Sequence, residues 1–302
     1  MSSFALALGQ LFDGLSLASI LLLAALGLSL SFGLMRVINM AHGEFLMAGG
    51  FLMYVAHQWV PGAGVALGLP LAFAGSALLG ALLERVLIRR LYGRPLDTLL
   101  ATWGVSLVLQ QLARDQFGST GVEVTAPPWL ADSFAIESGP LAGLAFAHVR
   151  IFIIGLAGIV LCGMVLLFNR TRAGLYIRAV NQHRGMASAL GVDTRRVDLL
   201  VFALGSGIAG LAGGALALIA PVTSTVGQSY VVDAFLVVIL GGMGTLRGTA
   251  IAALLIGVAS AVAETFTSIS FAKVILLLFV VAFLQFRPRG LVATRSRALE
   301  DA

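Results

Sequence analysis

Long apolar stretches separated by short polar connections dominate the chain. A helix needs about 17–25 mostly apolar residues to cross a bilayer, and nine stretches reach or approach that length. They lie near residues Gly14–Leu34, Phe45–Val60, Val65–Leu83, Thr98–Leu112, Ile151–Phe168, Leu199–Pro221, Ala234–Thr245, Thr249–Phe266 and Phe271–Phe286. The second, fourth and seventh are short, and the seventh suits a half-helix or a re-entrant segment. The pattern predicts an all-α polytopic membrane protein with eight or nine transmembrane helices, some short or interrupted.

Composition supports one transmembrane domain over residues 1–302. The chain is 59% hydrophobic and 11% charged, with a mean hydropathy of +1.00, and a soluble core cannot absorb that much apolar surface. The net charge of +5 does not indicate a nucleic-acid ligand, because the arginines flank the apolar stretches and form no single exposed stripe. The first 13 residues carry no Lys or Arg, so no signal peptide is expected, and the first stretch should remain as an anchor.

The distribution of basic residues orients the chain. If the nine stretches alternate across the membrane, only Arg114, Arg150 and Lys273 of the 19 Lys and Arg residues fall on one side. The positive-inside rule makes the other side cytoplasmic. We therefore expect the N-terminus and the 114–150 loop outside, and the 169–197 loop and the 287–302 tail in the cytoplasm.

The 169–197 loop carries six arginines between two apolar stretches. Its helix-forming part, Arg178–Leu190, should end at Gly191, since glycine suits the positive φ just past a helix. A basic cytoplasmic helix on a membrane protein suggests a surface that docks on another protein.

The 36 glycines are too many for simple anchoring helices. Gly207, Gly210 and Gly214 share one helix face. Small residues at that spacing favour close packing of the helix against its neighbours; the alternative is that this smooth face lets the helix slide or unwind. The run Leu240–Gly244, with its glycines Gly241, Gly242 and Gly244, predicts an interrupted helix. Such a break is tolerated at membrane depth only beside protein or a water-filled path.

Few residues could support catalysis. Intramembrane ionisable residues are often functional, and His42 and Glu44 start the second stretch, near the expected inner interface. Glu44 either caps a helix or pairs with Arg36, or else has a gating role. We find no metalloprotease, nucleophile-elbow or phosphate-loop motif. The one cysteine, Cys162, excludes multi-cysteine metal sites and is expected to be a buried, inert thiol. The sequence predicts no catalytic residue, no metal site and no cofactor.

Uncharged polar residues indicate a path for a transported solute. Thr102, Ser106 and Gln110 share a helix face at i, i+4 and i+8, and Ser206 lies in the sixth stretch. A path lined by hydroxyls and amides suits a small neutral, hydrogen-bonding solute. The alternative is that these residues form hydrogen bonds between helices.

Three blocks carry a family resemblance. The run Val37–Glu44 (VINMAHGE) resembles the N-x-A-H-G-E signature of branched-chain amino-acid-type permeases of ATP-binding-cassette (ABC) importers. The run Gly185–Gly191 (GMASALG) looks like that family's version of the E-A-A-x3-G cytoplasmic motif, although Gly185 and Met186 replace the Glu and Ala of the general pattern. Val237–Gly244 is similar to a third block. The resemblance extends from about Leu11 to Ala293, nearly the whole chain.

Within that family, Leu91–Gly104, Gly227–Phe235 and Arg287–Leu291 look closest to the urea-transporter permease. The resemblance implies a transport subunit, not an enzyme, that moves urea or a short amide across the bacterial inner membrane. A branched-chain amino-acid permease of the same family is the alternative, and an ATP-independent channel is a more distant one.

The resemblance also implies partners and site residues. The partners would be a second related permease, two ATPase subunits that hydrolyse ATP, a periplasmic solute-binding protein and membrane lipid. The 114–150 loop would then be periplasmic, and the 169–197 loop would couple the chain to an ATPase. The expected coupling residues are Arg178, Arg184, Met186, Ala187, Leu190 and Gly191. The polar and ionisable residues described above, and not the resemblance, give the expected translocation path, which comprises Thr102, Ser106, Gln110, Ser206, His42 and Glu44.

Overall fold

A computed structural model describes residues 3–35, 37–60, 64–135 and 145–292, and they are mostly helical. The helices are α1 (Ser3–Met35), α2 (His42–Trp59), α3 (Gly64–Leu83), the π-helical turn η1 (Glu84–Ile88), α4 (Arg89–Leu91), α5 (Pro95–Phe117), α6 (Pro128–Ala131), α7 (His148–Arg170), α8 (Arg172–Gln182), α9 (Arg184–Ala189), α10 (Thr194–Leu216), α11 (Val226–Gly241), α12 (Leu246–Phe266) and α13 (Ile269–Phe286). Two short antiparallel strands, β1 (Ser133–Ala135) and β2 (Ala145–Ala147), pair with each other. The all-α prediction therefore missed a small sheet, because three-residue strands leave no periodic signal.

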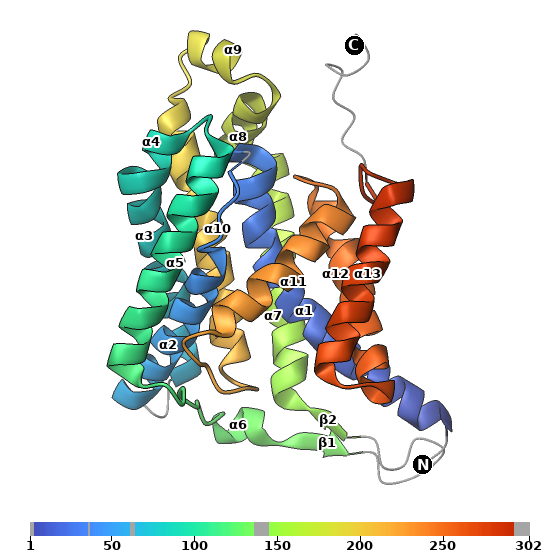
Figure 1. Cartoon of the computed structure of the whole chain (residues 1–302). Coiled ribbons are helices and arrows are strands. Elements are labelled where there is room, and N and C mark those ends of the chain that lie inside the picture. The colour runs from blue at the N-terminus through green and yellow to red at the C-terminus, as the bar shows by residue number, and fades with distance from the viewer. Residues whose placement is uncertain (1–2, 36, 61–63, 136–144, 293–302) are drawn as a thin grey trace.

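Six helices of the described chain are long and apolar enough to cross a membrane. They are Ala7–Gly33, Gly64–Leu91, His148–Arg170, Thr194–Leu216, Leu246–Phe266 and Ile269–Phe286. The second of these runs through α3, η1 and α4 as one rod. Figure 1 places β1, β2 and the start of the chain at one end of the bundle, and α8, α9 and the end of α13 at the other. The predicted outer and cytoplasmic loops thus lie at opposite ends.

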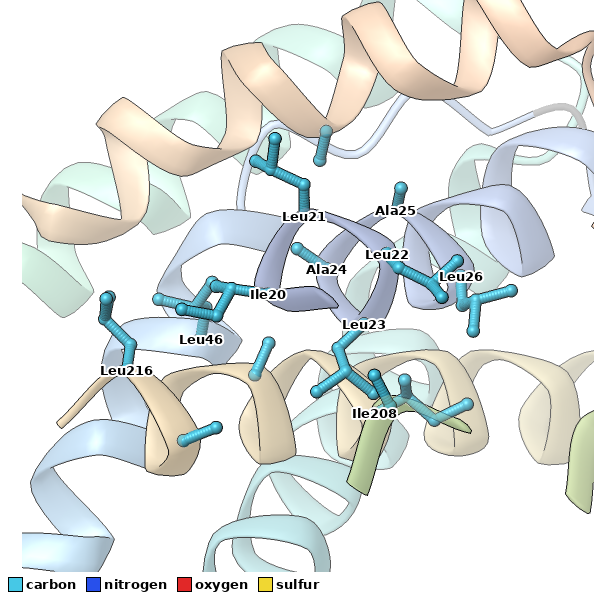
Figure 2. Packing of buried hydrophobic residues seen from close by; sticks show 14 of the residues in the cluster. Ile20, Leu21, Leu22, Leu23, Ala24, Ala25, Leu26, Leu46, Ile208 and Leu216 are labelled. Atoms are coloured by element: carbon cyan, nitrogen blue, oxygen red, sulfur yellow. The ribbon is translucent and has the colours of Figure 1, made fainter. Parts of the chain in front are cut away.

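Helix α1 lies at the centre of the bundle. Its side chains from Ile20 to Leu26 are all buried, and a helix that is apolar all round belongs inside a core. Figure 2 shows these leucines and alanines between neighbouring helices, with Leu46 of α2 and Ile208 and Leu216 of α10 in the same cluster.

Glycines let α10 approach its neighbours closely. A Cβ at Gly205 would crowd the carbonyl of Gly27 on α1, and a Cβ at Gly210 would overlap the carbonyl of Ala72 on α3. A Cβ at Gly213 would overlap the carbonyl of Leu46 on α2. Small residues at such contacts bring helix backbones together. The close-packing interpretation of this glycine-rich stretch is therefore the one that the geometry supports.

We expect Gly213→Ala to destabilise the fold by about 1–3 kcal/mol, the usual cost of overpacking, because the backbone of α2 must move. Gly158→Ala on α7 is the matched control, since nothing lies within 4 Å of the Cβ it would add. There, alanine should be neutral or stabilising by about 0.5–1 kcal/mol. Thermal unfolding of the two purified variants in one detergent measures the difference, and equal midpoints would contradict the packing argument.

The predicted helix break is the end of α11. Gly241 is the last residue of that helix, Gly242 and Gly244 have φ values of 97° and 78°, and α12 starts at Leu246. The tail stabilises this end, since the amides of Leu291 and Val292 donate to the carbonyls of Leu240 and Gly241 at 2.8 and 3.2 Å. Residues 293–302 of the predicted cytoplasmic tail lie outside the described residues.

Two expectations for individual segments are wrong. The sequence predicts the seventh apolar stretch at Ala234–Thr245, but its helix begins at Val226, because the polar residues around Gln228 and Asp233 conceal the first two turns. Cys162 was expected to be buried, but it is exposed. It lies on α7, which packs on the outside of the bundle and leaves most of its span uncovered.

Candidate functional site

The expected coupling helix Arg178–Leu190 is two helices, α8 and α9, and not one. The backbone of His183 is extended, with φ −155° and ψ 96°, and its Nδ1 accepts a hydrogen bond from the amide of Met186 at 3.0 Å. His183 thus caps α9 and separates it from α8, which the single-helix prediction missed. Gly191 has a φ of 86°, the positive value expected of a glycine just past a helix.

The tip of this coupling segment (α8 and α9) exposes apolar side chains. Met186 is 58% exposed and Leu190 78% exposed, whereas Ala187 between them is buried against the fold. Leu175 and Tyr176 of α8 are also exposed. Figure 1 shows α9 projecting at the end of the molecule. Clustered exposed apolar side chains are typical of a protein interaction surface.

Arg184 ties α9 to the bundle. Its guanidinium forms a two-point ion pair with Asp198 near the start of α10, and the Nη1–Oδ1 distance is 3.2 Å. The same guanidinium lies over the ring of Tyr92, with its carbon 5.4 Å from the ring centroid. The hydrogen bond with Asp198 raises the pKa of Arg184 further, so the cation persists at any physiological pH.

Tyr92 continues this chain of contacts to the π-helical turn η1. Its hydroxyl donates to Oε1 of Glu84 at 3.2 Å. Burial raises the pKa of Tyr92, so the hydroxyl remains a proton donor. Glu84 is fully buried and accepts two further bonds from Arg89, Nε–Oε1 at 3.2 Å and Nη2–Oε2 at 2.9 Å. We call Glu84, Arg89, Tyr92, Arg184 and Asp198 the inner-end network.

A polar stripe runs along the buried face of α5. Its members are spaced four residues apart and are Thr98, Thr102, Ser106 and Gln110. The opposite face carries exposed apolar residues such as Leu100 and Leu107. The periodicity of the sequence predicted the shared face of the last three, and the structure adds Thr98. A helix with a buried polar face and an exposed apolar face suits a lipid environment.

Glu44 of α2 joins this stripe. Its Oε1 accepts hydrogen bonds from the hydroxyl of Ser106 and from Nε2 of Gln110, both at 2.8 Å. Its Oε2 is buried and has no hydrogen-bond partner among the described residues, and the same is true of Nδ2 of Asn39. The hydroxyl of Thr102 accepts from the amide of Met40 at 3.0 Å. A buried carboxylate held only by neutral groups is costly, which marks this cluster as a candidate site.

Two expectations about Glu44 and His42 need correction. No side-chain cap bond forms at the start of α2, so Glu44 is not a helix cap, and Arg36, its other expected partner, lies outside the described residues. The ring Nε2 of His42 is 3.0 Å from the carbonyl oxygen of Ala24, near the middle of the Ala7–Gly33 span. The start of α2 therefore lies deep in the bundle and not at its inner surface, because residues 37–41 are not helical and run inward before α2 begins.

Ser206 is not part of the stripe cluster. Its hydroxyl donates to the carbonyl of Phe202 at 2.8 Å, and a Cβ at Gly80 of α3 would overlap it. Ser206 thus lies in the contact between α10 and α3.

Two cavities mark positions that the sequence did not reveal. One, of about 390 Å³, lies at the inner end and is lined by Met35, Val37, Leu91, Tyr92, Gly93, Arg94, Pro95, Thr98 and Arg184. The other, of about 370 Å³, involves charged groups of α1, α7 and α12: Asp13, Arg150 and Glu264. Each cavity combines helices far apart in sequence, so no local pattern could predict it.

The described residues contain no group of three or more His, Cys, Asp or Glu side chains that could hold a metal ion. The structure thus combines three features: the exposed apolar tip of the coupling segment, the inner-end network behind it, and a buried polar stripe that begins beside this network.

Comparisons with known proteins cover nearly the whole chain. The family model described as "Branched-chain amino acid transport system / permease component" matches residues 10–284. The chain is 28% identical to the high-affinity branched-chain amino acid transport system permease protein BraD of Pseudomonas aeruginosa, over 94% of this chain and 95% of that protein. It is 26% identical to LivH of Escherichia coli over the same shares, and 25% identical to the probable LivH permease of Methanocaldococcus jannaschii, over 94% and 91%. No solved structure matches the chain.

Proposed function

Because the chain belongs to the family of branched-chain amino acid transport system permease components, we propose that it is the transmembrane permease subunit of an ABC importer of branched-chain amino acids. The observation that carries this proposal is the match along nearly the whole chain, to the family model and to permeases whose names state that cargo. The chain would contribute no ATP hydrolysis of its own. Its place would be the bacterial inner membrane, which it would cross several times.

Urea, the cargo that three short stretches of sequence suggested, has less support. None of the relatives described above is named for urea. The chemical argument for urea also weakens. It rests on a helix face of hydroxyls and amides, and the carboxylate of Glu44 is hydrogen-bonded to that face. A zwitterionic amino acid carries an ammonium group for which a carboxylate is a natural partner.

Of the eight or nine crossings that the sequence predicts, we propose nine. Helices α2, α5 and α11 would add to the six long apolar helices. Helices α5 and α11 are not among those six for different reasons. The buried polar stripe lowers the hydropathy of α5, and α11 has only 16 residues. Nine crossings leave the start of α1 and the end of α13 on opposite sides, in agreement with the distribution of basic residues and with Figure 1.

The coupling segment would dock on an ATPase subunit. Met186 and Leu190 are exposed at its tip, and a groove on a soluble partner would cover them. Arg178, Ala187 and Gly191 would support the segment without forming its apolar tip. A complete importer would also contain a second related permease, a second ATPase and a periplasmic solute-binding protein.

The translocation path would follow the polar stripe. Thr102, Ser106 and Gln110 of α5 would line it together with Glu44 and His42 of α2. We leave Ser206 out of the path because its hydroxyl is bonded within α10, against α3. In this structure the cluster is closed, so solute passage would require α2 and α5 to separate.

Reconstitution tests the function directly. We expect liposomes that contain this chain, its partner permease, both ATPases and the binding protein to accumulate labelled leucine when ATP is supplied. Labelled urea and acetamide should enter at less than about a tenth of that rate, since hydrogen bonds to charged groups contribute about 1.5–3 kcal/mol and 1.4 kcal/mol is tenfold. Accumulation of urea without leucine would replace the proposed cargo, and uptake at full rate without ATP would indicate a channel.

A further inference from the structure

Three separate parts of the chain meet at the inner-end network. Arg184 starts α9, Asp198 lies near the start of α10, and Tyr92 follows the rod of α3, η1 and α4. Asp198 and Glu84 are almost fully buried, and each accepts charge-assisted hydrogen bonds from an arginine. Such bonds are about twice as strong as neutral ones. A displacement of α9 must therefore either move the other two parts or break this network.

The rod that Tyr92 follows is π-helical at η1. The amide of Arg89 donates to the carbonyl of Glu84, five residues earlier, and this wider turn brings the side chains of Glu84 and Arg89 onto one face. Single π-helical turns inside α-helices are rare and frequently occur at functional sites. Rewinding such a turn into an α-helix would rotate everything that follows it, so η1 is a natural two-state element.

The cavity of about 390 Å³ lies directly beside the network. Tyr92 and Arg184 line it, and so does Thr98, the first residue of the polar stripe. The rest of its wall is largely apolar and includes Met35 and Val37. The ring and the guanidinium therefore have empty space on one side, into which they can move without displacing a packed side chain.

We infer that Tyr92 is a positioning residue that transmits movement of α9 to the inner end of the polar stripe. The inference rests on the proposed function, because it presumes an ATPase that moves the coupling segment. Arg184 holds α9 on the face of the ring, and Glu84 holds the hydroxyl to η1. When α9 moves, the ring moves into or out of the cavity beside Thr98, which opens or closes the inner end of the stripe.

Two substitutions separate the contacts of Tyr92. Tyr92→Phe keeps the ring beneath Arg184 and removes only the hydrogen bond to Glu84, whereas Tyr92→Leu removes the ring as well. The readout is the number of leucine molecules imported per ATP hydrolysed by the reconstituted complex, which a purely structural role would leave unchanged. Tyr54→Leu is the matched control, since Tyr54 packs on Phe117 far from the network.

We expect Tyr92→Leu to lower leucine import per ATP by at least about fivefold, the lower end of typical coupling between sites, while the complex still assembles. Tyr92→Phe should give a ratio between those of the original chain and Tyr92→Leu, because it loses the hydrogen bond to the Glu84 carboxylate but keeps the ring beneath Arg184. An unchanged ratio in Tyr92→Leu overturns the inference. If Tyr92→Leu does not assemble, Arg184→Lys is measured in the same way, because lysine keeps the charge beside Asp198 but lacks the planar face that packs on Tyr92. An unchanged ratio of leucine imported per ATP in Arg184→Lys also overturns the inference.

A labelling experiment tests the movement itself. Cys162 is replaced by serine, Thr98→Cys is introduced, and a membrane-impermeant thiol reagent is applied from the ATPase side. Labelling should change with nucleotide in the otherwise unaltered chain and become independent of nucleotide with Tyr92→Leu. Nucleotide-dependent labelling that persists in Tyr92→Leu overturns the inference. Failure of the proposed function would look different, since the unaltered complex would then show no ATP-dependent leucine uptake at all.

Discussion

Met186→Asp is expected to reduce ATP-dependent uptake at least tenfold while the chain remains folded and inserted. Met186 is more than half exposed on α9, so the carboxylate is hydrated before the complex forms. Docking on an ATPase would desolvate that charge with no partner provided for it, which costs several kcal/mol. A loss of 1.4 kcal/mol is already tenfold. The measurement is leucine uptake together with co-purification of the ATPase subunits.

Met243→Asp provides the matched control for this experiment. Met243 is exposed to a similar extent, but it lies in the turn between α11 and α12 and not on the coupling segment. The same change of methionine to aspartate should leave ATPase binding intact there. Uptake by Met186→Asp at the original rate would disprove the docking role of α9, and an equal loss in both variants would indicate a general effect of added charge.

Glu44→Gln is the second change with a large expected effect. Glutamine keeps the shape of the side chain and an oxygen to accept hydrogen bonds from Ser106 and Gln110, but it removes the charge. If Glu44 receives the ammonium group of an amino acid in transit, leucine uptake should fall at least about tenfold, since bonds to charged groups contribute about 1.5–3 kcal/mol. Leucine uptake by reconstituted complexes measures the effect.

The stability of the same variant separates transport from folding. Glu44 is a buried carboxylate with one unpartnered oxygen, so glutamine should leave the thermal midpoint unchanged or raise it. Glu44→Leu should lower the midpoint instead, because it leaves the hydroxyl proton of Ser106 without an acceptor at about 1–3 kcal/mol and leaves Nε2 of Gln110 only its bond to Ser106. Normal leucine uptake by Glu44→Gln would mean that the carboxylate has no part in recognising the ammonium group.

Local patterns in the sequence predict much of this architecture. Hydropathy alone indicates a multi-helix membrane protein, and within the part of the chain that the structure describes six helices are long and apolar enough to cross a membrane. The four-residue spacing of Thr102, Ser106 and Gln110 predicts their shared face, and the glycine chemistry of Gly191 predicts the positive φ after α9. These features depend on residues a few positions apart, which is the range over which helical periodicity and backbone preferences act.

Only the tertiary structure decides which faces meet. No pattern in the sequence predicts that Tyr92 contacts Arg184 or that Glu44 accepts a hydrogen bond from Gln110, because these contacts depend on how distant helices pack. The break at His183, the depth of His42 and the exposure of Cys162 also follow from that packing, and each differs from the local expectation. Hydropathy determines whether a segment enters the membrane. Which other segments it packs against is determined by close helix approach at glycines such as Gly213 and by pairing of buried polar groups.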